Sequence, residues 1–507
     1  MSPIPYWSIL AFIFCTYVGS LSYSLQTLES VENLREQRSP VKIAIVGGGI
    51  GGTSNAFFLR DLFGEDAAIT LFEKGTIGGR LATVSIAGAQ YEMGGSIVHP
   101  RNLYMKQFLQ DFGLKERETK GTDGTLGIFN GEEFIFKSSR YSILTLIKML
   151  WRYGFDIFRL NWTIDKVLDK FARIYDFQDG GQSFTDIEGI MNAMGGEEFI
   201  GWLRKPLGVV LREEGFSERF IQELAAIATR ANYGQNLDMM GFAGMVSLAG
   251  AMPGLWSIEG GNKRVPQQLL QRSGATLMQS QVQSVERVTG KSAEKPIFRV
   301  TWNEPAKGDQ SIVFDIVMIA SPIEDNLSGI AFSGFDHPIT ANFTGDYRHT
   351  VASFIEGHQR PSTFGVSPKG QLPGSIFTNA EVPLNIRTLA KNYPVDYNPE
   401  TFNASRQVYK IFSTGVLNDT QMDSLFESYS EATHHDWLAY PYYHERNTFP
   451  GFVLSEGLFY PNAIEWAASA MEMAVIGSRN SAILAYHYWH GESPKGKVGT
   501  SRIRQEL

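Results

Sequence analysis

Glycines in a fixed spacing follow an apolar, β-branched run near the start of the chain. Residues 41–46 have the composition of a buried parallel strand, and Gly47, Gly49 and Gly52 follow in Gly-x-Gly-x-x-Gly spacing. In such a loop the first glycine permits a tight turn, the second lets the backbone approach a pyrophosphate, and the third lets the next helix pack on the strand. Residues 53–60 have helical composition, so a helix N-terminus would face the phosphates. The spacing predicts a dinucleotide site.

An acidic residue at the end of the next strand-like run supports this prediction. Residues 68–72 are again apolar and β-branched, and Glu73 follows them about 20 residues after the glycine triplet. An acid at that spacing accepts hydrogen bonds from the adenosine ribose. A glycine-rich turn without a ligand would not explain it. Glu73 and its neighbour Lys74 are therefore included in the expected cofactor site.

Further glycines downstream indicate a ligand that extends past the first loop. Gly79 and Arg80 come next, and Gly94, Gly95 and Ser96 follow a little later. A long, bent ligand of this kind favours FAD, whose ribityl chain continues beyond the pyrophosphate, over NAD. Arg80 would pair with the pyrophosphate through two parallel hydrogen bonds; a solvated surface arginine is the alternative.

A second helix N-terminus is predicted late in the chain. Asn462 lies in a Tyr-Pro-Asn turn, and the small residues 467–470 precede a helical run that begins at Met471. Open backbone N–H groups at Ala470 and Met471 would face the ribityl and flavin oxygens. A C-terminal packing helix is the alternative explanation of the same residues.

Composition and charge exclude several other classes of protein. The chain has 507 residues, 43% of them hydrophobic, and 45 basic against 53 acidic side chains give a net charge of −8. These values are typical of a globular protein and provide no basic stripe for nucleic acid. The single cysteine, Cys15, lies in an apolar N-terminal run. We therefore expect no disulfide, cysteine-ligated zinc, thiol nucleophile or cysteinyl cofactor link in a chain that lacks this run. No metal is expected as a cofactor.

The N-terminus predicts entry into the secretory pathway. The apolar residues 9–18 are too few to cross a bilayer, and small residues follow between Ser20 and Ser24. We expect a cleaved signal peptide over residues 1–24, with an uncleaved anchor as the alternative. Asn-x-Ser/Thr sequons agree with this route and predict glycans at Asn161, Asn326, Asn342, Asn403 and Asn418.

Segments outside the glycine motifs resemble one family. Residues 229–235 (TRANYGQ) and 245–263 (MVSLAGAMPGLWSIEGGNK) are similar to prenylcysteine oxidases, also called prenylcysteine lyases, as is the block from Asn462. With the glycine motifs, the chain resembles amine-oxidase-like flavoproteins from residue 41 to about residue 482. The resemblance implies FAD, molecular oxygen, a farnesyl- or geranylgeranyl-cysteine substrate and a lysosomal or vacuolar compartment.

The same resemblance suggests individual contacts. By analogy Val282 would contact the adenine through its backbone, and Asn462 stands where amine oxidases usually carry an acid. Within the family-like segments, Arg230 would pair with the substrate carboxylate, Tyr233 would wall the pocket and Glu259 would meet the ammonium group. A structural ion pair, a core aromatic residue and a turn acid are the respective alternatives.

A prenyl thioether is a suitable substrate for a flavin. Its C1 hydrogen is allylic and adjacent to sulfur, so loss of hydride and addition of water would give an aldehyde, free cysteine and, with oxygen, hydrogen peroxide. No side-chain nucleophile is required. His99 is a candidate for a position beside the flavin, and a packed, hydrogen-bonded histidine is the alternative. An amine oxidase, an isoprenoid desaturase and a secreted flavin carrier without turnover are the other functions considered.

The elements that must position these residues form an α/β fold. We expect a Rossmann-type FAD-binding domain of the amine-oxidase-like kind, interleaved with an α+β substrate domain, with further strands at 281–286, 298–302 and 312–322. The predicted FAD-binding parts are 39–115, 246–330 and 451–490; the substrate-facing parts are 116–245 and 331–450, helical first and strand-rich later; and the predicted mobile tail is 491–507.

One apolar, aromatic segment allows two structural interpretations. Residues 141–160 contain interspersed basic side chains at Lys148, Arg152 and Arg159. Such a segment could lie at a membrane interface and admit a greasy substrate. A helix that faces the core of the substrate domain explains the same pattern and is the expectation carried forward.

Overall fold

The computed structural model describes residues 40–288, 295–304, 307–324, 327–339 and 345–491. The predicted signal peptide, the sequons at Asn326 and Asn342 and nearly all of the predicted tail lie outside these residues. The boundaries between the FAD-binding and substrate-facing parts stay predictions.

A mostly parallel sheet carries the glycine-rich loop. In the described part of the chain its strand order is β18-β19-β11-β1-β2-β7. The predicted first strand is confirmed as β1, which pairs in parallel with β2 on one side and β11 on the other. The sheet consists of β1 (Val41–Val46), β2 (Ala67–Phe72), β7 (Thr276–Met278), β11 (Ile316–Ile319), β18 (Val453–Ser455) and β19 (Leu458–Phe459).

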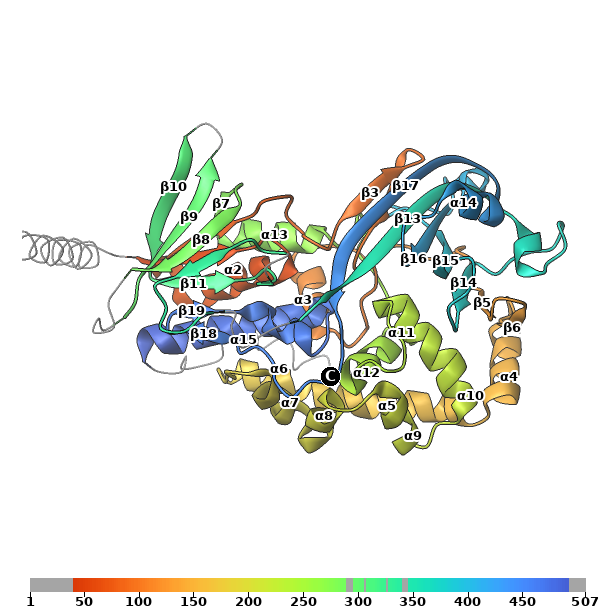
Figure 1. Ribbon diagram of the computed structural model, residues 1–507, viewed down its shortest axis with the longest axis horizontal. Coiled ribbons are helices and arrows are strands. Elements are labelled where there is room, and N and C mark those ends of the chain that lie inside the picture. The colour runs from red at the N-terminus through yellow and green to blue at the C-terminus, as the bar shows by residue number, and fades with distance from the viewer. Residues whose placement is uncertain (1–39, 289–294, 305–306, 325–326, 340–344, 492–507) are drawn as a thin grey trace, which may run out of the picture.

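Three helices that are far apart in sequence pack together beside this sheet (Figure 1). They are α2 (Ile50–Phe63), α13 (Arg264–Ser273) and α15 (Met471–His490). Two buried hydrogen bonds fix α15 on α2: the Asn55 side-chain amide donates to the Ser478 carbonyl, and the Ser478 hydroxyl donates to the Gly51 carbonyl. The C-terminal helix is thereby held beside the first loop.

The expected strand at 312–322 is wrong in one respect. The chain forms two strands there, which belong to different sheets and are separated at Asp315. Asp315 is buried, and it exchanges two hydrogen bonds with the backbone of Lys42 on β1. This pairing ends one strand and starts the next. The second sheet contains β8 (Val282–Arg287), β9 (Phe298–Glu304), β10 (Gly308–Phe314) and β12 (Ala331–Ser333).

A third sheet extends away from the parallel sheet (Figure 1). Its two longest strands, β13 and β17, pair antiparallel along most of their length. In the described residues the sheet contains β5 (Leu126–Phe129), β6 (Phe134–Lys137), β13 (Tyr347–Gln359), β14 (Ser375–Thr378), β15 (Ile386–Asn392), β16 (Val408–Ser413) and β17 (Phe426–Pro441). The hairpin β3 (Thr83–Ile86) and β4 (Ala89–Glu92) packs on it, and α14 (Asp419–Leu425) precedes β17.

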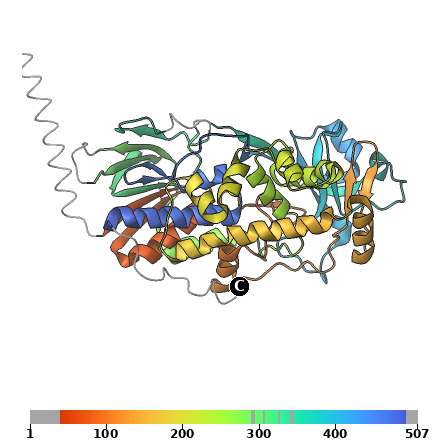
Figure 2. The same ribbon diagram turned by 90° about the horizontal axis from the view of Figure 1, so that it is seen from below.

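Helices of the middle of the chain lie along one side of both sheet regions (Figure 2). They are α4 (Ser142–Tyr153), α5 (Asp156–Phe171), α6 (Arg173–Asp179), α7 (Ile187–Gly195), α8 (Glu197–Leu203), α9 (Leu207–Glu213), α10 (Glu218–Phe220), α11 (Ala226–Tyr233) and α12 (Gly241–Ala249). The remaining helices are α3 (Leu103–Asp111) and the short turns η1 (Gly64–Asp66), η2 (Ile221–Ala225), η3 (Pro361–Phe364), η4 (Ala404–Arg406) and η5 (Pro461–Trp466). In the described residues no helix is both long and apolar enough to span a bilayer.

The expectation of a core-facing helix over residues 141–160 is wrong. The segment forms two helices, α4 and α5, that break at Gly154, whose φ of +58° suits glycine. Only Tyr153 of α4 is buried, and its large apolar side chains are turned to solvent. Helical periodicity located the apolar face but did not reveal which way that face points.

One buried carboxylate joins two helices near the loops. Glu472, in the first turn of α15, accepts hydrogen bonds from the backbone N–H groups of Tyr104 and Met105 and from the Tyr175 hydroxyl. The first two donors belong to the opening turn of α3, where N–H groups have no partner within the helix. Burial raises the pKa of Glu472 to about 7, although these hydrogen bonds act to lower it.

This pKa predicts a pH-dependent stability. The folded protein keeps the Glu472 proton up to about pH 7, whereas the unfolded chain releases it near its ordinary value. The proton on Glu472 therefore adds to the free energy of unfolding at acid pH. This contribution falls by up to about 3 kcal/mol as the pH rises to 7. Denaturant titrations at several pH values should show the advantage of wild type over Glu472→Gln shrinking along this range. As a control, Glu259→Gln, at an exposed residue, should show the same dependence of the free energy of unfolding on pH as the wild type. If Glu472→Gln also showed that dependence, the raised pKa could not be assigned to Glu472.

Candidate active site

A cavity of about 810 Å³ lies where the loops, the helical region and the long strands meet. Its lining begins at the carboxyl end of β1, continues through the loops after β2 and β4, and is completed by α5, α11, α12, β17 and the start of α15. Crevices at the carboxyl ends of parallel strands are the usual ligand sites of such sheets.

The first loop leaves its backbone open to this cavity. Gly47 has a φ of +110°, and its N–H donates to the Phe72 carbonyl. A Cβ at Gly52 would lie 1.8 Å from the Gly47 carbonyl oxygen, so the third glycine is required for close packing. A Cβ at Gly49 would meet its nearest protein atom, the Gly78 carbonyl oxygen, only at 3.9 Å. Gly49 therefore keeps space free for a ligand, as predicted for the second glycine.

A second loop packs against the first. The Gly78 N–H donates to the Gly48 carbonyl, and Gly79 lies so close that a Cβ there would be 3.3 Å from the Gly49 Cα. The Gly95 N–H donates to the Arg80 carbonyl, so the segment that contains Gly94 and Gly95 lies beside the second loop. Three backbone segments thus line one side of the cavity with few side chains.

Glu73 is held at the edge of this backbone surface. One of its carboxylate oxygens accepts a hydrogen bond from the Gly48 N–H and the other from the Gly75 N–H, each at 2.6 Å. These contacts fix the carboxylate at the end of β2, where an adenosine ribose would lie beside the loop. Both Glu73 and Lys74 line the cavity.

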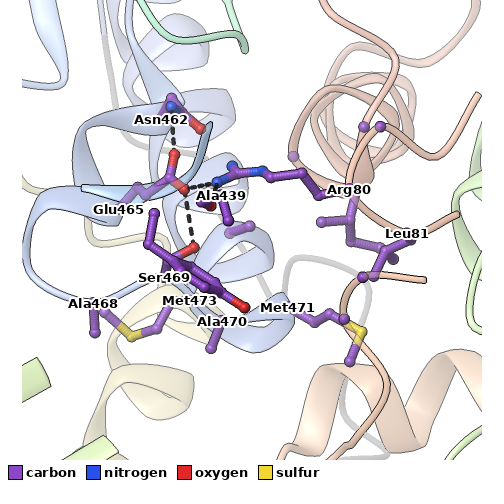
Figure 3. A pocket seen from close by; sticks show the side chains of 18 of the residues that line it. Arg80, Leu81, Ala439, Asn462, Glu465, Ala468, Ser469, Ala470, Met471 and Met473 are labelled. Carbon is purple, nitrogen blue, oxygen red and sulfur yellow. Dashed lines mark hydrogen bonds and ion pairs between the residues drawn. The ribbon is translucent and has the colours of Figure 1, made fainter. Parts of the chain in front are cut away.

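Arg80 faces an acid that sequence analysis did not place in the site. Its guanidinium pairs with Glu465 of η5 and donates to the Ala439 carbonyl of β17 (Figure 3). Burial acts to lower the pKa of Arg80, but the Glu465 carboxylate raises it above its ordinary value. Asn462 donates its side-chain amide to the same carboxylate at 2.8 Å. An acid thus stands three residues after Asn462, in the same short helix.

The N-terminus of α15 also opens on the cavity. Ala470 is its N-cap residue and contributes no side-chain cap, and Ala470, Met471, Glu472 and Met473 all line the cavity. Unpaired N–H groups and the positive end of the helix dipole therefore face the ligand space. Ser469 and Met471 are seen on either side of this turn in Figure 3.

The residues present fit FAD. Two helix N-termini, a bare glycine backbone, an acid at the ribose position and an arginine surround one cavity. The predicted cofactor residues that line it are Gly47, Gly49, Glu73, Lys74, Gly79, Arg80, Gly94, Gly95, Ser96, Val282, Asn462, Ala470 and Met471. Gly52 lies behind the loop, in agreement with its packing role.

Another part of the lining is an apolar chamber that sequence analysis did not identify. The chamber residues come from α5, α12 and β17: Val167, Leu168, Phe171, Phe242, Met245, Val246 and Leu438. The three elements are distant in sequence, so no local spacing joins them. The only signal was the family-like segment from Met245, which forms part of α12.

The three predicted substrate residues have different positions. Tyr233 lines the cavity, is buried, and donates its hydroxyl to the Ser469 carbonyl at 2.7 Å. Arg230 is buried outside the lining, where it pairs with Glu381 and donates to the Thr378 carbonyl. Glu259 is exposed and also lies outside the lining. The structure therefore brings only Tyr233 to the cavity.

His99 lines the cavity, and its ring accepts a hydrogen bond from the backbone. Burial lowers its pKa, and the nearby Arg101 lowers it further. Its Nδ1 accepts a hydrogen bond from the Arg101 N–H at 3.1 Å, which places the proton of the neutral ring on Nε2. In this state His99 can donate a hydrogen bond but has no free basic nitrogen. Among the described residues no cluster of metal-ligating side chains occurs.

The open space at Gly49 gives a specific prediction. In Gly49→Val the new side chain meets no protein atom closer than 3.9 Å at Cβ, so the fold should survive while the pyrophosphate is displaced. We expect most of the bound FAD to be lost from the purified protein, measured by flavin absorbance per chain. Gly415→Val, at a glycine with equally open surroundings outside the cavity, is the matched control and should keep full flavin content. Full flavin in Gly49→Val would place the cofactor elsewhere.

Solved structures of amine oxidases share this fold. A putrescine oxidase triple mutant aligns with a TM-score of 0.56 at 16% identity, over 88% of this chain and 98% of that chain. Cyclohexylamine oxidase from Brevibacterium oxydans aligns with a TM-score of 0.55 at 15% identity, over 89% of this chain and all of that chain. At this identity the likeness establishes the fold alone, and it confirms the predicted amine-oxidase-like architecture.

Sequence comparison gives the family. Residues 45–112 match an NAD(P)-binding Rossmann-like domain, and residues 136–496 match the family described as prenylcysteine lyase. The chain is 41% identical to human prenylcysteine oxidase 1 and 39% identical to the bovine protein, over 90% of each chain in both cases. It is 37% identical to the mouse protein named prenylcysteine oxidase 1-like, over 90% of this chain and 92% of that one. This chain is an FAD-dependent oxidoreductase and belongs to the prenylcysteine lyase family.

Proposed function

We propose that this protein oxidatively cleaves the thioether bond of farnesyl- or geranylgeranyl-cysteine. The carbon attached to sulfur loses a hydride, water adds to that carbon, and the carbon–sulfur bond breaks to give an isoprenoid aldehyde and free cysteine. The electron pair reduces O₂ to hydrogen peroxide, so one O₂ and one water are consumed for each substrate. Prenylcysteines are degradation products of prenylated proteins, and the names of the relatives indicate the same substrate.

The observation that carries the proposal is the composition of the cavity. One part is polar backbone suited to a dinucleotide, and the adjoining chamber is lined by aliphatic and aromatic side chains such as Leu168, Phe171 and Phe242. An isoprenoid chain offers no hydrogen-bonding groups, so an apolar chamber beside the cofactor is the recognition it requires. A polar amine with a short carbon chain would leave much of this surface without contacts.

The chain's own residues have limited tasks in this reaction. When bound, FAD supplies the two-electron acceptor for the hydride and returns the electrons to O₂. The glycine loops, Arg80 and the start of α15 hold the cofactor, and the chamber orients the isoprenoid and excludes most water from it. His99 can donate a hydrogen bond through Nε2 to an oxygen or sulfur atom that enters the cavity. A nucleophilic side chain is not needed at any stage.

The oxidation state of the products tests the reaction. Incubated in air with farnesyl-cysteine, the purified protein should yield farnesal, cysteine and hydrogen peroxide in equal amounts, measured by chromatography and a peroxide assay. Deuterium at C1 should slow single-turnover flavin reduction several-fold, because the C–H bond breaks in that step. Farnesol without peroxide would rule out oxidative cleavage. Oxidation of simple amines without action on farnesyl-cysteine would favour an amine oxidase instead.

We also infer a secretory route that ends in an acidic compartment such as the lysosome or vacuole. Three of the predicted glycan sites, Asn161, Asn403 and Asn418, are exposed. The raised pKa of Glu472 favours the folded protein at acid pH. Both observations agree with the apolar N-terminal run, and neither depends on the reaction.

This route predicts a processed and glycosylated chain. Terminal sequencing of protein from its native source should find the first residue between positions 21 and 25, because the small residues there suit signal peptidase. Treatment with an N-glycosidase should lower the mass by whole glycan units. Removal of the sequon threonine or serine at one exposed site should abolish one unit. An intact Met1 in an unglycosylated chain would overturn the assignment.

A further inference from the structure

The consecutive helices α4 and α5 present large apolar side chains to solvent. Six of the exposed side chains, Ile143, Ile147, Trp151, Phe155, Phe158 and Trp162, are called the α4–α5 surface here, and Leu144 and Leu146 of α4 are exposed as well. Trp151 is 88% exposed, Phe155 81% and Ile143 75%. On α4 these residues are spaced by four, and on α5 by three and four, so each set forms one ridge. Large contiguous apolar patches on a protein surface mark interaction sites.

The polarity of α4 is inverted with respect to a helix that covers a core. Its inward side carries polar anchors beside the apolar Met149: Arg152 makes two hydrogen bonds with the Glu223 carboxylate, and Tyr153 donates to the same group. At the other end, the Thr145 hydroxyl exchanges hydrogen bonds with the backbone of Ser139. These hydrogen bonds fix the orientation of α4, and in this orientation most of its large apolar side chains face solvent.

Basic side chains accompany the apolar row. Arg140 just before α4, Lys148 on α4 and Lys166 on α5 are exposed, and the Lys166 ammonium lies 5.4 Å from the centre of the Trp162 ring. Of the acids on and beside the two helices, Asp156 pairs with Arg159 and Glu223 with Arg152, and the exposed Asp165 is the sequence neighbour of Lys166. The surface therefore offers aromatic and aliphatic groups bordered by positive charge, which is the composition of helices that lie in the interface of an anionic bilayer.

The same helix leads from this surface to the cavity. Phe155 and Phe158 lie at the exposed end of α5, and Leu168 and Phe171 at its other end line the chamber. Figure 2 shows α5 running along the underside of the molecule from α4 toward the parallel-sheet region. At 1.5 Å per residue, the two ends are about 20 Å apart. The continuity joins the exposed apolar groups to the apolar chamber through one rigid element.

We propose that the α4–α5 surface docks this protein on an anionic lipid bilayer, with α4 and the start of α5 lying in the plane of the headgroups. Trp151 and Phe155 enter the boundary between headgroups and acyl chains, where aromatic rings are favoured, and Trp162, next to the predicted glycan site Asn161, stays at the rim of the docked surface. The basic side chains contact the lipid phosphates. Docking rests on this surface alone and does not depend on the proposed reaction. If that reaction is correct, the docked enzyme meets a substrate that partitions into membranes.

Vesicle flotation tests this inference. The purified holoenzyme is mixed with vesicles of equal parts phosphatidylcholine and phosphatidylserine, and with vesicles of phosphatidylcholine alone. We expect the wild type to float with the mixed vesicles, less with the neutral ones, and less at high salt. The double variant Trp151→Glu/Phe155→Glu should bind the mixed vesicles at least roughly tenfold more weakly, because it loses two buried apolar groups and adds negative charge. Both residues are exposed, so folding and flavin content should be unchanged.

A matched control changes two exposed apolar residues elsewhere. Val416→Glu/Ile312→Glu adds the same charge outside the α4–α5 surface and should bind vesicles like the wild type, apart from a small effect of net charge. Equal vesicle binding by the wild type and by Trp151→Glu/Phe155→Glu would overturn the proposal, and would point to another segment such as residues 1–39. A wild-type dimer in solution that the double variant dissociates, without vesicle binding by either, would identify the surface as an interface between copies and also overturn it.

Discussion

The close approach of three glycine-bearing backbone segments at the end of the parallel sheet is the constraint on which the site depends. Gly52 must lack a side chain so that α2 can start against the Gly47 carbonyl, and Gly79 must lack one to lie against Gly49. The result is a wall of backbone N–H groups at a helix N-terminus, which can bind phosphates without any charged side chain. Every other feature of the cavity is positioned relative to this wall.

The opposite side of the cavity is brought to the wall by contacts between distant parts of the chain. Hydrogen bonds from Asn55 and Ser478 fix α15 on α2, and Glu472 fixes the same helix on α3. The Arg80–Glu465 ion pair joins the second loop to the turn before α15. Because these links converge on one end of α15, the cofactor space and the apolar chamber form one continuous cavity.

Sequence alone could predict the features that depend on local spacing. The roles of Gly49 and Glu73 follow from an order of strand, loop, helix and strand within about 30 residues. The chamber could not be predicted, since α5, α12 and β17 meet only in the folded chain. A family-like segment does not by itself show which of its side chains reach the cavity. Tyr233 lines the cavity, whereas Arg230, three residues earlier in the same segment, does not. For the same reason the exposed face of α4 was mistaken for a core face.

In the proposed reaction the isoprenoid chain lies in the apolar chamber next to the cofactor, and one rate measurement tests this placement directly. Val246, a partly buried chamber residue on α12, is replaced by tryptophan to fill that space. Rapid mixing without oxygen should then show flavin reduction by farnesyl-cysteine slowed roughly a hundredfold or more, a cost of about 3 kcal/mol, while flavin content and reduction by dithionite match the wild type. Reduction by farnesyl-cysteine at the wild-type rate in Val246→Trp would contradict the account.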